Sequence, residues 1–199
     1  MKYTKSLDNL IECFKLLPGI GEKNAERLAF SILDFDDNQI DTFTNSLNNV
    51  HTKIHECKTC FNLTEDSEEC VICNDKSRDE DVICVVENTK NLMMFEKANI
   101  FNGKYHVLGG LISPLEGINP EDIKISELIC RIKDKNIKEL ILALNPSMEG
   151  ETTALYISKL LDGLDIKVTK IAAGVPVGAD MEYLDTITIQ RALEGRTEL

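Results

Sequence analysis

Residues 82–87 read Val-Ile-Cys-Val-Val-Glu, and residues 140–144 read Leu-Ile-Leu-Ala-Leu. Apolar runs of this length are typical of parallel strands that are buried on both faces of a sheet. Apolar spacing between and after them predicts helices over about 88–98, 121–133, 151–161 and 186–194, and shorter strands over 105–108 and 166–171. This alternation predicts an α/β fold with a parallel sheet and helices on its faces.

The chain before the sheet is helical and contains a glycine-rich turn. We expect helices over about 7–17, from about 22, and a third that Asp36 caps with Gln39 in the capping-box position. The turn between the first two reads Leu-Pro-Gly-Ile-Gly over 17–21. Gly19 and Gly21 permit a tight turn and a close approach of the backbone, and the next helix starts with free N–H groups. Such a helix start attracts anions, so we interpret the turn as a site for a DNA phosphate.

Lys23 and Arg27 lie four residues apart on one face of the helix that leaves this turn. Like charges at this spacing destabilise a helix slightly, and contact with phosphates would offset that cost. The alternative is a solvated helix face, because Glu22 and Glu26 form an acidic stripe beside the basic one. We favour the interpretation of Lys23 and Arg27 as DNA contacts.

Four cysteines follow in a C-x2-C…C-x2-C pattern, at Cys57, Cys60, Cys70 and Cys73. Two such pairs match the ligands of one tetrahedral Zn²⁺, and a closed shell of four thiolates makes the site structural. We therefore expect one structural zinc per chain and do not expect His51 or His55 as ligands. The remaining cysteines lie in apolar stretches and are expected as core thiols: Cys13, Cys84 and Cys130.

The charge of the chain counts against bulk binding of nucleic acid. The 199 residues carry a net charge of −12, which also excludes a peripheral binder of anionic membranes. Residues 1–30 hold five basic and four acidic side chains, so the acidity belongs to the rest of the chain. No apolar run reaches the roughly 20 residues that span a bilayer, and we expect a cytoplasmic protein.

Few carboxylates follow the two main strands. Glu87 ends the first one, whereas Asn145 and Ser147 follow the second, with Glu149 a little further on. A Mg²⁺ site for phosphoryl transfer needs a cluster of carboxylates at this edge of the sheet. The sequence therefore indicates a weak metal site. His106 is interpreted as a structural residue.

Several stretches together resemble the RecR family of bacterial recombination mediators. They are the turn and helix at 17–30, the four cysteines, the Tyr-His-Val-Leu-Gly-Gly run that opens 105–117, and the segments 145–157, 174–178, 182–185 and 192–196. The resemblance covers almost the whole chain in order. It implies a helix–hairpin–helix domain (1–54), a four-cysteine zinc finger (55–78), a Toprim domain with a parallel α/β sheet (79–174) and a C-terminal assembly segment (175–199).

The resemblance also implies a function. Catalytic Toprim enzymes place a Glu after the first strand and an Asp-x-Asp after a later one. Glu87 fits the first position, but Asn145-x-Ser147 stands in the second. This implies a non-enzymatic DNA-binding protein of recombinational repair, bacterial and nucleoid-associated, rather than a Mg²⁺-dependent Toprim nuclease or nicking enzyme. A pure protein scaffold without DNA contact is a third, weaker alternative.

RecR-like proteins work with RecO and RecF, promote the loading of RecA on single-stranded DNA, and assemble into dimers or rings of four. Carried over by position, Lys23 and Arg27 are contacts to single- or double-stranded DNA, and Glu87 and Glu149 are contacts to RecO. Ala173 and Thr186 depart from the residues usual in the family. Because both lie near or in the assembly segment, the departures weigh against a nucleotide-binding role there.

Overall fold

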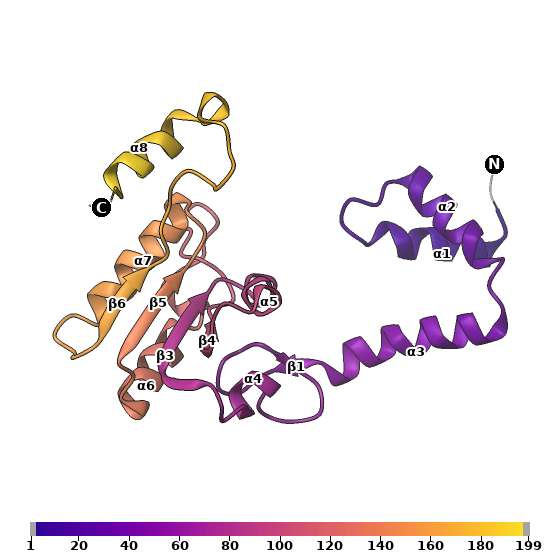
Figure 1. Cartoon of the computed structure of the whole chain (residues 1–199). Coiled ribbons are helices and arrows are strands. Elements are labelled where there is room, and N and C mark those ends of the chain that lie inside the picture. The colour runs from indigo at the N-terminus through magenta and orange to yellow at the C-terminus, as the bar shows by residue number, and fades with distance from the viewer. Residues whose placement is uncertain (1–2, 197–199) are drawn as a thin grey trace. The chain divides into compact units, whose positions relative to one another are not determined.

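The structure is a computed structural model that describes residues 3–196. The chain divides into two compact units, with the division between Ile54 and His55 (Figure 1). The outermost residues of the expected first and last parts, 1–2 and 197–199, lie outside the described residues.

The first unit consists of three helices, α1 (Lys5–Lys15), α2 (Glu22–Ile32) and α3 (Asp37–Lys53). Two alanines on α2, Ala25 and Ala29, are buried against Ile11 of α1. Their small side chains allow the two helices to pack closely around the turn that joins them. The expected capping box at the start of α3 is confirmed, since Asp36 and Gln39 bond each other's backbone N–H at 2.8 and 3.0 Å.

The second unit is built on four parallel strands in the order β4-β3-β5-β6. This confirms the α/β fold with a parallel sheet. The strands are β3 (Asp79–Val86), β4 (Gly103–Val107), β5 (Glu139–Ala143) and β6 (Lys167–Lys170), and the main helices are α5 (Thr89–Ala98), α6 (Ile125–Lys135), α7 (Met148–Leu160) and α8 (Thr186–Glu194). Short elements complete it: β1 (His55–Glu56), β2 (Leu63–Thr64), α4 (Val71–Asn74) and the 3-10 turns Pro120–Asp122 and Met181–Tyr183.

Alternate residues of β3 point to the two faces of the sheet and into two cores. Ile83 and Val85 pack with α6 and α7, whereas Cys84 and Val86 pack with α5 (Figure 1). The cysteines at 57, 60 and 70 belong to the second core. The segment that carries these cysteines therefore shares the core of the sheet.

Some elements begin or end elsewhere than the sequence predicts. The helix expected over 121–133 is α6, which starts only at Ile125. Ile123 is buried with an extended backbone, and the next N–H, that of Lys124, bonds the Leu108 carbonyl at 2.9 Å. Because of this hydrogen bond to a residue distant in sequence, the expected first turn of the helix does not form. In contrast, α7 starts earlier than expected, at Met148, because the Ser147 hydroxyl caps it.

The cysteines outside the four-cysteine pattern differ in burial. Cys84 lies in the core of the sheet, as expected, and burial raises the pKa of its thiol to about 12. The expectation was wrong for Cys13 and Cys130, which are exposed on α1 and α6. Apolar neighbours in sequence do not decide on which side of a helix a residue lies.

The C-terminal segment returns to the sheet through Arg191 of α8. Its guanidinium donates to the Pro146 carbonyl at 3.0 Å and lies 3.5 Å from the Glu151 carboxylate. The helix forms with Thr186 as its first residue, capped by Asp185. Within residues 3–196, no helix is long and apolar enough to cross a membrane.

Candidate metal centre and nucleic-acid interface

The four cysteines of the pattern converge on one point. Their Sγ atoms all lie within 4.8 Å of one another, and three of the side chains are buried while Cys73 is half-buried. Cys60 and Cys70 are 3.5 Å apart, and Cys57 and Cys73 are 3.8 Å apart. A tetrahedron with Zn–S bonds of about 2.3 Å has edges of about 3.8 Å, so the arrangement fits one Zn²⁺.

Hydrogen bonds also connect the sulfur atoms with the backbone and with one another. The backbone N–H of Cys70 donates to the Cys57 sulfur at 3.2 Å. The contact between Cys60 and Cys70 lowers the pKa of the Cys70 thiol and raises that of the Cys60 thiol, because the two sulfur atoms share a hydrogen bond. The group of side chains placed to bind a metal includes neither His51 nor His55.

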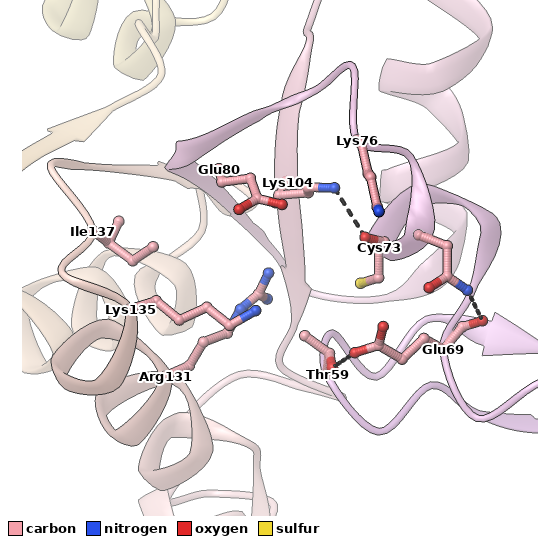
Figure 2. A pocket seen from close by; sticks show the side chains of 10 residues that line it. Thr59, Glu69, Cys73, Lys76, Glu80, Lys104, Arg131, Lys135 and Ile137 are labelled. Carbon is pink, nitrogen blue, oxygen red and sulfur yellow. Dashed lines mark hydrogen bonds between the residues drawn. The ribbon is translucent and has the colours of Figure 1, made fainter.

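The segment 55–78, the four-cysteine module, is joined to the sheet by groups on β4. The N–H of Val107 donates to the Cys60 carbonyl at 2.8 Å. Lys104, only 5% exposed, donates to the carbonyls of Ile72, Cys73 and Asp75 at 2.7–3.1 Å (Figure 2 shows the bond to Cys73). Its ammonium group thereby stabilises the end of the short helix α4.

His106 lies on β4 two residues after Lys104 and has a packing role. It is fully buried, its ring contacts that of Phe61, and its Nε2 donates to the Lys124 carbonyl at 2.8 Å. Burial lowers the pKa of His106 to about 4, so the ring is neutral at physiological pH. It serves the contact between the module and the sheet.

The turn between α1 and α2 has the geometry of an anion site. The Ile20 N–H bonds the Leu17 carbonyl at 3.1 Å, and Gly19 has φ +80°, as the third position of a type II turn requires. Gly21 caps α2 without a side chain, and the first N–H bonded within the helix is that of Ala25. The preceding N–H groups of the first turn are therefore free to bind an anion.

Lys23 and Arg27 flank this helix start. Both side chains are exposed, and neither has an ion-pair partner among the described residues of the chain. A β-carbon added at Gly21 would meet no atom within 4 Å, so the space before the turn is open. Packing thus gives no reason for glycine at this position, whereas close approach of a ligand does.

The carboxyl edge of the sheet brings Glu87 and Asn145 together. The Asn145 amide donates to the Glu87 carboxylate at 2.5 Å. An amide therefore occupies the place where a catalytic metal site would have a second carboxylate. Glu149 lies in the first turn of α7, where its own backbone N–H lowers the pKa of its carboxyl.

Sequence reasoning missed Lys104, which joins the module to the sheet. The available signal was the position of Lys104 directly before the apolar run that starts at Tyr105, since a lysine buried with such a strand needs hydrogen-bond acceptors. Arg131 of α6 was also missed; its Nη1 donates to the Tyr105 carbonyl at 2.6 Å.

Comparison with known families matches almost the whole chain. Residues 7–51 match the model described as RecR, helix-hairpin-helix, residues 81–172 match the Toprim domain, and residues 174–197 match RecR, C-terminal. The two RecR models flank the Toprim match and the four-cysteine module that precedes it.

Curated relatives are similar over their full length. The chain is 49% identical to "Recombination protein RecR" of Staphylococcus haemolyticus over 199 residues, which is 100% of both chains. It is 47% identical to the protein of the same name from Natranaerobius thermophilus over 197 residues (99% and 98%), and 49% identical to that from Clostridium perfringens over 195 residues (98% of each).

Proposed function

Because the chain belongs to the RecR family of recombination proteins, we propose that it is a non-enzymatic, DNA-binding mediator of recombinational repair. In this proposal it acts with RecO and RecF in the bacterial cytoplasm and promotes loading of RecA on single-stranded DNA. The observation that carries it is the turn at 17–21, whose free N–H groups stand beside two unpaired cations, Lys23 and Arg27. We propose Gly19 and Gly21 as the positions where the backbone approaches a phosphate.

We propose a separate role for each consecutive segment of the chain. Residues 1–54 hold the DNA-binding hairpin, 55–78 the zinc finger, 79–174 the Toprim domain and 175–199 the assembly segment. The compact unit that ends at Ile54 supports the first boundary. One Zn²⁺ per chain, bound by the four cysteines, has a structural role because four thiolates leave no open coordination position.

The DNA role is tested with the double variant Lys23→Gln, Arg27→Gln. Each lost phosphate contact should reduce the slope of log affinity against log salt by about 0.9 on duplex DNA, so we expect a reduction of about 1.8. The control is Lys5→Gln, Lys15→Gln, which removes the same charge from α1 of the same unit, together with the exposed ion pair of Lys15 and Glu12. Equal salt slopes for the two double variants would refute the proposed contacts.

The alternative function is a Mg²⁺-dependent Toprim nuclease. The hydrogen bond from Asn145 to Glu87 argues against it, because it places an amide where a second carboxylate ligand of the metal would be needed. Plasmid cleavage with Mg²⁺ or Mn²⁺ is the assay. Cleavage that disappears in Glu87→Ala would establish the nuclease and overturn the mediator.

The acidity of the Toprim part supports a protein partner there. We propose Glu87 and Glu149 as contacts to RecO, and a homodimer or homotetramer, in the form of a ring clamp, as the DNA-binding assembly. An assembly adds hairpins, and several weak contacts on one strand raise the affinity. The test is the affinity for RecO of Glu149→Gln, with Glu116→Gln, a carboxylate elsewhere on this unit, as its control. Equal affinity of the two variants would count against Glu149.

A further inference from the structure

A cavity of about 220 Å³ lies where the four-cysteine module meets the sheet and α6. Its walls are formed by the module, by β3 and β4, and by the C-terminal half of α6 (Figure 2). It lies within the second compact unit and is separate from both the hairpin turn and the Glu87–Asn145 pair.

The charge of this cavity is opposite to that of the chain. Four cations line it, Lys76, Lys104, Arg131 and Lys135, against two carboxylates, Glu69 and Glu80. Without the metal centre, these six side chains sum to a formal charge of +2, in a chain with a net charge of −12. Random placement of the charges of this sequence would favour an acidic cavity, so the excess of cations needs a reason.

Three of these six charged groups already have hydrogen-bond partners. The Nη1 atom of Arg131 donates to the Tyr105 carbonyl at 2.6 Å. Lys104 uses its ammonium group on three backbone carbonyls of the module. Glu69 accepts a hydrogen bond from the Thr59 hydroxyl. The groups that remain for a ligand are Lys76, Lys135, the other nitrogen atoms of Arg131 and the single carboxylate Glu80.

Each of these three cations still has a donor without an acceptor. Within residues 3–196, the side chains of Lys76 and Lys135 have neither a hydrogen bond nor an ion pair, and both are exposed. The Nε atom of Arg131 is buried and has no hydrogen-bond partner in the same residues. A buried donor without a partner costs free energy, which a bound acceptor would recover. Figure 2 shows Arg131 and Lys135 reaching from α6 and Lys76 from the opposite wall.

We propose that this cavity binds a phosphate group, and specifically a terminal phosphate. An arginine with lysines around it offers charge-assisted donors from several sides, which suits the oxygens of a phosphate. A terminal phosphate has three free oxygens and enters a cavity end-on. An internal phosphodiester has only two, and its chain continues on both sides. The two sources of such a group are the end of a DNA strand and a free mononucleotide.

A competing role for the same cations is to balance the metal centre. Four thiolates with one Zn²⁺ carry a charge of −2, and Cys73 lines the cavity. Under this role, loss of the lysines would weaken zinc retention rather than phosphate binding. The two roles therefore predict different results for the same variants.

The first experiment measures binding of inorganic phosphate to the full-length, zinc-loaded chain by calorimetry. The double variant Lys76→Gln, Lys135→Gln should bind phosphate about tenfold more weakly or worse, because two charge-assisted contacts are lost. Neither lysine side chain has a hydrogen bond or an ion pair within residues 3–196, so the fold and the zinc content should be unchanged. The matched control, Lys97→Gln with Lys133→Gln, removes the same charge from α5 and α6 outside the cavity.

Glu80→Gln supplies a test of opposite sign. It removes the one unoccupied carboxylate of the cavity, so phosphate should bind more tightly than to the wild type. The proposal is overturned if wild-type protein binds no phosphate, if the cavity and control variants bind it equally, or if the cavity variant loses zinc while phosphate binding is unchanged.

The second experiment distinguishes the sources of the phosphate. It compares a 5′-phosphorylated oligonucleotide, the same oligonucleotide with a 5′-hydroxyl, and a mononucleotide, in the Lys23→Gln, Arg27→Gln background that lacks the proposed hairpin contacts. A preference for the 5′-phosphorylated strand that Lys76→Gln, Lys135→Gln abolishes assigns the cavity to DNA ends. Binding of the mononucleotide alone, lost in the same variant, assigns it to a free nucleotide. Because inorganic phosphate is tested first, failure of the hairpin proposal would leave this inference standing.

Discussion

The substitution Gly21→Ala separates DNA binding from folding more sharply than a change of charge. Gly21 is the N-cap of α2 with φ −81° and ψ 169°, a conformation that alanine also adopts. A β-carbon there would meet no atom within 4 Å. The added methyl group therefore costs no space inside the protein, but it stands before the free N–H groups of the first helical turn.

Gly21→Ala should change the free energy of unfolding much less than it changes the affinity for DNA. Alanine is a poorer N-cap than glycine by about 0.5 kcal/mol, whereas loss of glycine's freedom in the unfolded chain contributes about 0.4–1 kcal/mol in the other direction. The free energy of unfolding should thus change by less than about 0.5 kcal/mol. A phosphate kept away from the turn loses charge-assisted hydrogen bonds worth roughly 1.5–3 kcal/mol, so DNA affinity should fall about tenfold to hundredfold.

The assays are urea unfolding and fluorescence anisotropy with a labelled oligonucleotide at low salt. Gly19→Ala is the comparison, because φ +80° at that position strains any residue with a β-carbon. It should lower the stability of the first unit by about 1–2 kcal/mol. Wild-type DNA affinity in Gly21→Ala would refute the assignment of the turn as a phosphate site. A loss of affinity that only accompanies unfolding would refute it as well.

Three further predictions concern the second unit. Metal analysis by mass spectrometry should find about one zinc per chain, and Cys60→Ser should lose it together with a lower melting temperature, because metal binding stabilises the folded module. Gly150→Ala should cost about 3 kcal/mol in urea unfolding, because the new β-carbon would lie 1.9 Å from the Asn145 carbonyl oxygen, and backbone cannot yield as a side chain does. The pKa of His106 is about 4 in the folded chain and about 6.5 when unfolded, so the unfolded chain binds more protons between these values; stability is full above pH 6.5 and falls by about 3 kcal/mol towards pH 4. His106→Gln should lack this part of the pH dependence, and an unchanged profile would contradict it.

The secondary structure was predictable where the signals are local. The turn at 17–21, the capping box at Asp36 and the strand over 82–87 follow from neighbouring residues, and each lies close to its expected place. The sequence missed the late start of α6, because a hydrogen bond from Lys124 to the distant Leu108 decides it. It also misplaced Cys13 and Cys130, because the burial of a helix residue depends on what packs against the helix.

The candidate sites divide in the same way. The spacing of the four cysteines is enough to indicate a zinc site, since two short pairs of thiolates define a tetrahedron wherever the module lies. The free helix start behind Gly21 is likewise a local property of turn and helix.

Only the tertiary structure decided how these parts act together. The register of β3 with β4 and β5 brings Asn145 to Glu87, 58 residues away, and places an amide where a catalytic metal would need a second carboxylate. The packing of the cysteine module on the sheet places Lys104 on its carbonyls and gathers Lys76, Arg131 and Lys135 around one cavity. Periodicity and spacing encode local geometry, but contacts between distant residues depend on strand order and packing, which no short stretch of sequence contains.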